Sequence, residues 1–319
     1  MAKLGFRSMS VFLSSPVLIF SLGAALFIAL AVGARDRLSP QPDVLLSQSR
    51  PVGMAVCADC HTLAAEHWAH TVHARPSGTQ IECESCHGPG SAHIQAPDDP
   101  LSIVRFSRTS EHSIQTQNGQ CLACHDGGKR LHWHASVHET ADLACSDCHN
   151  PMASISGRNL LARESVNDTC MMCHRETRID FNRMSHMPLF EGKVGCLDCH
   201  NPHGSAFDML LHTPTVNETC YSCHAEKRGP FLFEHAPVSD NCLTCHSPHG
   251  SNHEKLLVTA RPLLCQQCHS MSGHMNELIT SGFLPDARFP DPRLVSRSCQ
   301  NCHSQIHGSN HPAGSRLQR

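Results

Sequence analysis

The sequence predicts an elongated fold of short helices and irregular segments, with essentially no β-sheet. Two observations support this prediction: one short motif recurs throughout the chain, and aromatic residues make up only 5% of its 319 residues. A hydrophobic core of the ordinary kind needs more large apolar side chains than this. The 20 glycines and 20 prolines also disfavour long helices or strands. We therefore expect groups bound by the recurring motif to supply most of the core.

The recurring motif is Cys-x-x-Cys-His, and its ten copies use all 20 cysteines. It is the attachment sequence of c-type haem, in which two thiols bind the haem and the adjacent imidazole becomes an axial iron ligand. Zinc sites, redox dithiols and disulfide frameworks can use Cys-x-x-Cys, but none requires the following His. We number the sites 1 to 10 in chain order: Cys57, Cys60 and His61; Cys83, Cys86 and His87; Cys121, Cys124 and His125; Cys145, Cys148 and His149; Cys170, Cys173 and His174; Cys196, Cys199 and His200; Cys220, Cys223 and His224; Cys242, Cys245 and His246; Cys265, Cys268 and His269; Cys299, Cys302 and His303.

The motif therefore predicts a multihaem cytochrome c with ten covalently bound haem c groups. Since no cysteine is left over, we predict no disulfide and no reactive thiol. Such a chain should fold only as the haems are attached, as small metal-binding domains fold only with their metal.

The sites alternate between two classes, which we call odd and even. The segment Val166-Asn167-Asp168-Thr169-Cys170 before an odd site recurs as Val216-Asn217-Glu218-Thr219-Cys220, and the phrase Asn201-Pro202-His203-Gly204-Ser205 after an even site recurs as Ser247-Pro248-His249-Gly250-Ser251. After the segment 1–34, five two-haem units are predicted, over residues 35–115, 116–165, 166–212, 213–259 and 260–319. Repeats of this kind contact mainly their neighbours and build extended structures.

Local structure is predicted to be sparse. Asn167 and Asn217 are expected to be N-caps of short helices that run through the motifs that follow them. Residues 63–73 can form another helix. The longest stretches between motifs, residues 94–120 and 275–298, are expected to be loops.

The second axial ligand of each iron is predicted from histidines at matched repeat positions. Odd sites are followed by a His some 11 to 13 residues past the motif His, and even sites by a Pro-His-Gly-Ser phrase or a relative of it. His274, only five residues past its motif, is the least regular. The predicted ligands are His73, His93, His138, His186, His203, His235, His249, His274 and His307.

Met152 departs from the repeat. It follows His149-Asn150-Pro151, at the place where the sibling units have His203 and His249. Three alternatives remain open. Met152 itself binds an iron, which raises the reduction potential relative to two imidazoles. A substitute comes from His112, His132 or His134. Or the position is open and Met152 only packs.

The N-terminal segment predicts export. Lys3 and Arg7 precede an apolar run over residues 11–32, and small residues follow at Gly33 and Ala34. This pattern is typical of a cleaved signal peptide, with an uncleaved inner-membrane anchor as the alternative. Both place the body of the chain outside the cytoplasm. The formal net charge is −3, and no basic run points to nucleic acid.

The ten motifs, the export segment, the Asn-Pro-His-Gly-Ser phrase and the closing Ile306-His307-Gly308-Ser309-Asn310-His311-Pro312 together resemble the MtrA/DmsE family of decahaem cytochromes. The resemblance implies a periplasmic electron wire associated with the outer membrane. Its partners would be a porin-like β-barrel, an outer-surface multihaem cytochrome and periplasmic or inner-membrane carriers. It also implies bis-histidine haems throughout, so that Met152 puts one haem near the middle of the chain in doubt.

Three functional hypotheses follow. The first is an electron-transfer wire through an outer-membrane barrel, serving metal reduction or ferrous iron oxidation, and the second is a soluble periplasmic shuttle. The third is a multihaem enzyme, which needs one iron open to substrate. All ten motifs are intact, and ligands are predicted for nine irons, which favours an electron carrier with no catalytic residues.

Overall fold

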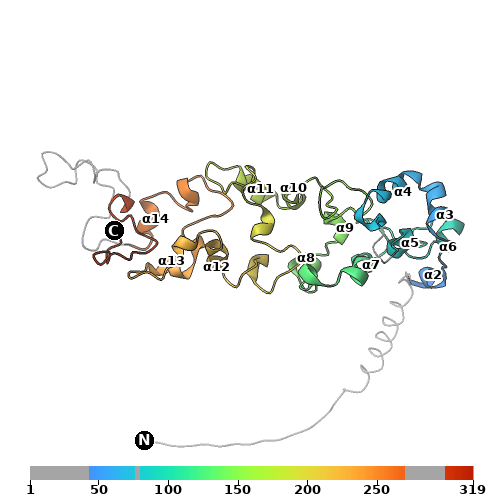
Figure 1. Cartoon of the computed structure of the whole chain (residues 1–319), viewed down its shortest axis with the longest axis horizontal. Coiled ribbons are helices and arrows are strands. Elements are labelled where there is room, and N and C mark those ends of the chain that lie inside the picture. Colours follow the sequence, from blue (N-terminus) through green and yellow to red (C-terminus); the bar gives the residue numbers. More distant parts are fainter. Residues whose placement is uncertain (1–42, 76–79, 270–298, 319) are drawn as a thin grey trace, which may run out of the picture.

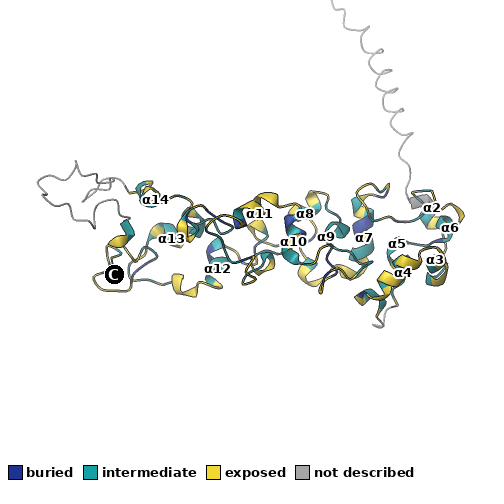
Figure 2. Cartoon of the chain, turned by 90° about the horizontal axis from the view of Figure 1, so that it is seen from above, coloured by how far each residue is buried: buried dark blue, intermediate teal, exposed yellow. Residues whose placement is uncertain are grey.

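The computed structural model describes residues 43–75, 80–269 and 299–318. The chain advances steadily along one elongated body, from the helices of the first unit at one end to those of the last at the other (Figure 1). A view turned by 90° shows the same extended form (Figure 2). The predicted export segment, His274 and the loop predicted over residues 275–298 lie outside the described residues.

The helices are short. The α-helices are α2 (Asp43–Gln48), α3 (Met54–Cys60), α4 (Thr62–Ala69), α5 (Cys83–His87), α6 (Ser91–Gln95), α7 (Ile114–His125), α8 (Val137–Thr140), α9 (Cys145–Cys148), α10 (Val166–Met171), α11 (Arg175–Phe181), α12 (Val216–Tyr221), α13 (Ala236–Asp240) and α14 (Leu263–Gln266). The 3-10 turns are η1 (Val72–Ala74), η2 (Gly128–Arg130), η3 (Cys196–Asp198), η4 (Asp208–Leu210), η5 (Ala225–Lys227), η6 (Cys242–Thr244), η7 (Glu254–Leu256) and η8 (Cys299–Asn301).

Within the described ranges there is no strand, only isolated antiparallel bridges. Three of them close the same hairpin after sites 4, 6 and 8: His149 with Leu161, His200 with Leu211, and His246 with Leu257. Since one hairpin recurs at three even sites, the repeat seen in the sequence is also a repeat of backbone shape. The predicted fold class, an elongated multihaem cytochrome with short helices and no sheet, is confirmed.

Apolar packing between protein side chains is limited. A single cluster of Met171, Phe181 and Leu189 forms the largest buried apolar group in the described part of the chain. Elsewhere large apolar side chains face outward, among them Leu63 and Leu131, which are 63% and 67% exposed. A chain of this size normally buries most of its large apolar side chains. Protein side chains alone therefore form only a small part of the core, and other groups must supply the rest.

Of the predicted local elements, one is confirmed in part and one is partly wrong. The helix expected over residues 63–73 is confirmed in its first part by α4, which is rich in alanine and other good helix formers. The loop expected over residues 94–120 is wrong at both ends, because α6 reaches Gln95 and α7 begins at Ile114. Its N-cap is Ser113, whose hydroxyl accepts a hydrogen bond from Thr116 N–H at 3.0 Å. No helix among the described residues is long and apolar enough to span a membrane.

Candidate haem-binding sites

Each Cys-x-x-Cys-His motif forms one helical turn. The histidine amide donates to the carbonyl of the first cysteine, for example at 2.9 Å in site 1 and at 3.0 Å in site 6. Positions i, i+3 and i+4 of a turn share one face. Both thiols and the imidazole therefore point to the same side, as one haem requires. None of the 20 cysteines forms a disulfide.

The ten motifs lie next to one another in chain order. Within each unit the first cysteines of the odd and even motifs interact through their thiols: Cys57 with Cys83, Cys121 with Cys145, Cys170 with Cys196, Cys220 with Cys242, and Cys265 with Cys299. Between units the second cysteines are electrostatic neighbours: Cys86 of Cys124, Cys148 of Cys173, Cys199 of Cys223, and Cys245 of Cys268. Together these contacts form a continuous series from site 1 to site 10.

The second cysteines differ in exposure between the odd and even sites, with one exception. Those of the odd sites are exposed, namely Cys60, Cys124, Cys173, Cys223 and Cys268. Those of even sites 2, 4, 6 and 8 are half-buried, but Cys302 of even site 10 is exposed. Cys302 thus departs from the exposure pattern of the other even sites. Its amide nevertheless donates to Cys299 O at 3.2 Å, and the amide of His303 to the same carbonyl at 2.9 Å, so that site 10 keeps the attachment turn.

Burial and neighbouring thiols shift the thiol pKa values. Burial, followed by the charge of Cys242, raises the pKa of Cys220 to about 12. Burial, followed by the charge of Cys299, raises the pKa of Cys265 to about 11. These thiols are thus protonated at neutral pH in the polypeptide. The thiols of the third unit differ, because the hydrogen bond with Cys170 lowers the pKa of Cys196 to about 7.

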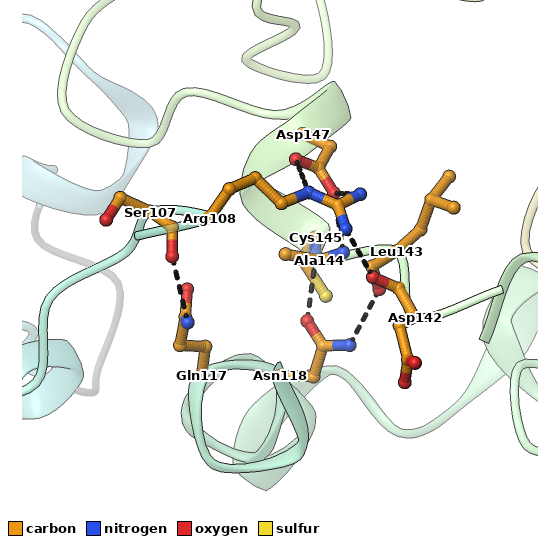
Figure 3. A network of polar contacts seen from close by, with 9 residues as sticks. All are labelled: Ser107, Arg108, Gln117, Asn118, Asp142, Leu143, Ala144, Cys145 and Asp147. Atoms are coloured by element: carbon orange, nitrogen blue, oxygen red, sulfur yellow. Dashed lines mark hydrogen bonds and ion pairs between the residues drawn. The ribbon is translucent and has the colours of Figure 1, made fainter. Parts of the chain in front are cut away.

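An asparagine joins the two motifs of units 2, 3 and 4. Three residues before the first cysteine of the odd site, Asn118, Asn167 and Asn217 each use Oδ1 to accept the amide of the first cysteine of the following even site. Figure 3 shows this contact for Asn118, which also donates to Leu143 O at 3.0 Å, with a bidentate Arg108–Asp147 ion pair beside it. The side chain thereby holds two successive attachment turns together.

This contact corrects the prediction that Asn167 and Asn217 are N-caps. Ser165 caps α10 and Thr215 caps α12, and the asparagine is the second residue of each helix. Moreover α10 ends at Met171, before the motif is complete. The asparagines face the neighbouring motif because its cysteine amide has no helical partner of its own.

In the first unit the two motifs are connected by a carboxylate instead of an asparagine. Met54 stands at the asparagine position, and Glu84 of site 2 instead accepts from the amides of Val52 (2.9 Å), Gly53 (2.8 Å) and Gly90 (2.8 Å). Although burial alone would raise the pKa of Glu84, the three amide donors lower it overall. A charged carboxylate thus connects sites 1 and 2.

Predicted distal histidines face motif histidines of other sites. Seven such pairs have ring centroids 6.0–6.2 Å apart: His61–His93, His73–His125, His138–His174, His149–His203, His200–His249, His235–His269 and His246–His307. This spacing leaves room for one metal ion between two imidazoles at about 2 Å per bond. In the part of the chain described, no group of three or more metal-binding side chains occurs that could hold an ion without a macrocycle.

The pairs follow a rule that the sequence does not reveal. A histidine after an odd site faces the motif two sites ahead, as His73 does at site 3 and His138 at site 5. A histidine after an even site faces the motif two sites back, as His203 does at site 4 and His249 at site 6. Histidines of neighbouring units therefore face each other in both directions along the chain. At the N-terminal end His93 turns to site 1 instead.

The even-site motif histidines are oriented by backbone carbonyls. Nδ1 donates to a downstream carbonyl in each of them: His87 to Val104 (2.8 Å), His149 to Asn159 (2.7 Å), His200 to Met209 (2.7 Å), His246 to Lys255 (2.9 Å) and His303 to Arg316 (2.7 Å). Such a bond fixes the tautomer and directs Nε2 toward a metal. In the hairpins after sites 4, 6 and 8, the accepting residue and the next one have positive φ, as in Met209 and Leu210 (54° and 57°).

Burial keeps several of the distal histidines neutral. It lowers the pKa of His203 to about 4, with further contributions from His149 and other nearby cations. The pKa values of His93, His249 and His307 are also lowered, again chiefly by burial. Neutral imidazole is the form that binds a metal, so these environments suit ligands.

The seven pairs leave three motif histidines, His87, His224 and His303, and the first two of these have no histidine opposite them in the described residues. The rule places His186 opposite His224, but in the structure its Nδ1 is bonded to Arg183 O (2.7 Å) and its Nε2 faces Glu191 (3.2 Å). The remaining predicted ligand, His274, is not described.

The haem site whose second axial ligand is uncertain is therefore not the one that the sequence indicated. The sequence put the uncertain haem near the middle of the chain, beside Met152. Yet His149, the motif histidine of that unit's even site, faces His203 with rings 6.0 Å apart and 13° from parallel. Site 4 therefore has two facing histidines, whereas at site 2, near the N-terminal end, the ring beside His87 is Phe106 and not a histidine.

Successive single-turn motifs, paired histidines and an elongated body with little core of its own define a multihaem c-type cytochrome. Residues 134–179, 186–229 and 235–274 match the family of the doubled CXXCH motif. The chain is 45% identical over 240 residues to the multiheme cytochrome MtrA of Shewanella baltica, covering 75% of this chain and 71% of that protein. The chain belongs to the MtrA family of multihaem electron-transfer cytochromes. A partial match, 30% identical over 120 residues, relates it to the cytochrome c-type protein NrfB of Haemophilus influenzae, covering 34% of this chain and 51% of that protein.

Proposed function

We propose that this cytochrome carries ten haems and acts as an electron wire between periplasmic or inner-membrane carriers and the cell exterior. It would lie in the periplasm, associated with an outer-membrane porin-like barrel, with an outer-surface multihaem cytochrome beyond. The observation that carries this proposal is the continuous series of neighbouring attachment turns along an elongated body (Figure 1). A wire needs closely spaced redox centres, because electron tunnelling falls steeply with distance.

The attachment and ligand assignment is part of the proposal. All 20 cysteines, from Cys57 to the exposed Cys302, would bind haem. The ten motif histidines would bind iron on one side, and His73, His93, His138, His186, His203, His235, His249, His274 and His307 on the other. The bound haems would supply one-electron redox chemistry. Where both axial positions are filled, no substrate would bind at the iron.

The polypeptide supplies the positions of these groups. The thiols fix each macrocycle to its turn, and the Nδ1 bonds orient the imidazoles, as Met209 O does for His200. The asparagines, such as Asn118 and Asn217, keep successive turns in contact. Neighbouring haems would therefore be held at fixed separations along the body.

Haem count and barrel association test the proposal together. We expect intact-mass spectrometry of the purified protein to give ten haems. We also expect mild-detergent extracts of the outer membrane to show a haem-stained complex that contains a β-barrel protein. In liposomes carrying this complex, an external reductant should reduce a redox dye enclosed in the lumen.

A matched variant isolates the wire itself. Changing Cys196 and Cys199 to Ser removes the site 6 haem from the middle of the series. It should abolish dye reduction while the barrel complex still forms. Haem found only in the soluble periplasmic fraction, with no barrel, would replace the wire by a shuttle. A high-spin signal from one iron in ten with turnover of a small substrate would instead support an enzyme.

A further inference from the structure

Met152 lies on a hairpin that copies the ligand-bearing hairpins of its siblings. Its amide donates to Asn150 Oδ1 at 3.1 Å, as the amide of His203 donates to Asn201 Oδ1 at 3.2 Å. The hairpins share the bridge that closes them, the positive-φ pair and the carbonyl that accepts from the motif histidine. Met152 therefore occupies the position from which its siblings reach toward another unit.

The direction of that reach is fixed by the pairing rule. His203, His249 and His307 each face the even-site motif histidine one unit back, at 6.0, 6.2 and 6.2 Å between ring centroids. Applied to Met152 in the second unit, the same step leads to His87 in the first. It does not lead to His149, which already faces His203.

His87 is prepared for a metal in the same way as the other even sites. Its Nδ1 donates to Val104 O at 2.8 Å, which leaves Nε2 available. Its ring neighbour in the structure is Phe106, edge-on at 5.2 Å, and not a histidine. His93, the candidate from the same unit, faces His61 instead, with rings 6.2 Å apart.

The three nearby histidines that the sequence offers as substitutes have other contacts, which for His132 involve its backbone. His112 is only 2% exposed; its Nε2 is bonded to Ile103 O at 3.1 Å, and its Nδ1 is buried with no hydrogen-bond partner in the polypeptide. His134 has Glu139 at 3.0 Å from Nδ1 and Asp126 at 3.7 Å from Nε2. His132 belongs to the contact with the third unit, where its carbonyl lies against Gly204.

The residue after Met152 also differs from its counterpart in the sibling hairpin, and this difference favours methionine over histidine as the ligand. Ala153 follows it where the sibling hairpin has Gly204, at which a Cβ would lie 1.8 Å from the carbonyl oxygen of His132. With a Cβ, the Met152 hairpin cannot approach the preceding unit as closely. A methionine side chain is unbranched and flexible, so its sulfur can take more positions relative to the hairpin than the nitrogen of a rigid imidazole ring.

We infer that Met152 is the distal ligand of the haem attached at Cys83 and Cys86, opposite His87. Site 2 would then hold a His/Met haem among bis-histidine haems. A thioether in place of an imidazole raises the reduction potential. The haem one place from the N-terminal end of the series would thus be the one that holds an electron most strongly.

This inference rests on the proposed haem set, and its test uses the purified haem-loaded protein. In the oxidised protein we expect a sulfur-to-iron charge-transfer band in the far red, with the intensity of one iron in ten. Both Met152→Ala and Met152→His should abolish the band. Met152→His should also remove the highest-potential component from a redox titration. The control is Met184→Ala, at a side chain 72% exposed and outside every site, which should keep both signals.

A second pair of variants identifies the haem. His87→Ala should abolish the band, whereas His149→Ala should leave it, each compared at the haem count found by mass spectrometry. Loss of the band in His149→Ala alone would assign Met152 to site 4 and overturn the inference. So would a wild-type protein without the band, whether all its irons are low-spin or one is high-spin. If the band is absent while ten haems and the barrel complex are present, the inference fails and the proposed function stands.

Discussion

The odd and even sites share one motif but differ in how the polypeptide surrounds it. At the odd sites the motif histidines, such as His125 and His174, are exposed in the polypeptide, and those of sites 1, 3, 5 and 7 have no backbone acceptor at Nδ1 in the described structure. At the even sites they are half-buried and bonded to a carbonyl at 2.7–2.9 Å. An imidazole that donates from Nδ1 is a more basic ligand and stabilises ferric iron. One repeated motif can therefore place its histidine in two different polypeptide environments.

The largest effect is expected where an even-site hairpin packs on the preceding unit. In Gly204→Ala the new Cβ would lie 1.8 Å from His132 O, at a φ of 109° that favours glycine. We expect a loss of about 3 kcal/mol in the free energy of unfolding, in the upper range for overpacking. Denaturant titration of the haem-loaded protein measures it.

The matched control is Gly157→Ala, in the corresponding hairpin of the second unit, where a Cβ would meet nothing within 4 Å. It should change stability by less than about 0.5 kcal/mol. Equal losses in the two variants would show that inter-unit packing does not distinguish the even hairpins.

The next effect concerns the asparagine that joins an odd to an even site. Asn217 accepts from Cys242 N–H at 2.8 Å and donates to Val238 O and Ser239 O at 3.0 and 3.2 Å. Because Asn217→Ala removes all three of these part-buried hydrogen bonds, it should cost about 2 kcal/mol. The control Asn182→Ala removes an exposed hydrogen bond to Arg178 O. It should lower the free energy of unfolding by less than about 0.5 kcal/mol. A similar cost for both would mean that Asn217 does not connect the sites.

That asparagine also shows where the sequence could and could not predict the structure. The motif fixes the turns, and the repeat gives the two site classes and the ligand candidates. Asn217 looked like an N-cap because asparagine before a helix usually is one. Its true partner, the Cys242 amide, is 25 residues away and becomes close only when the motifs pack together. Pairing across units, as in His149 with His203, likewise depends on tertiary structure rather than on local sequence.

A smaller effect should separate the two classes electrochemically. The hydroxyl of Ser205 donates to Leu211 O and accepts from Phe207 N–H at 3.0 Å, which shapes the hairpin that presents Met209 O to His200. Ser205→Ala should cost about 1 kcal/mol. By loosening the Nδ1 bond, it should also raise the potential of one haem slightly.

The control is Ser222→Ala at odd site 7, where the hydroxyl donates to Thr219 O at 2.6 Å. We expect it to leave every potential unchanged in a spectroelectrochemical titration. If Ser205→Ala shifts no potential either, the carbonyl bonds do not set the difference between odd and even sites.

The smallest effect is expected at the start of an odd-site helix. Thr215 Oγ1 accepts from Glu218 N–H at 3.1 Å and caps α12, so Thr215→Ala should cost about 1 kcal/mol. The control Thr109→Ala loses only an exposed contact to Ser107 and should be neutral. Haem count and potentials should stay at wild-type values in Thr215→Ala, because the cap lies upstream of the motif and touches no imidazole. A change in the site 7 potential would contradict this, since it would mean that odd-site haems, too, depend on the fine geometry of the backbone around them.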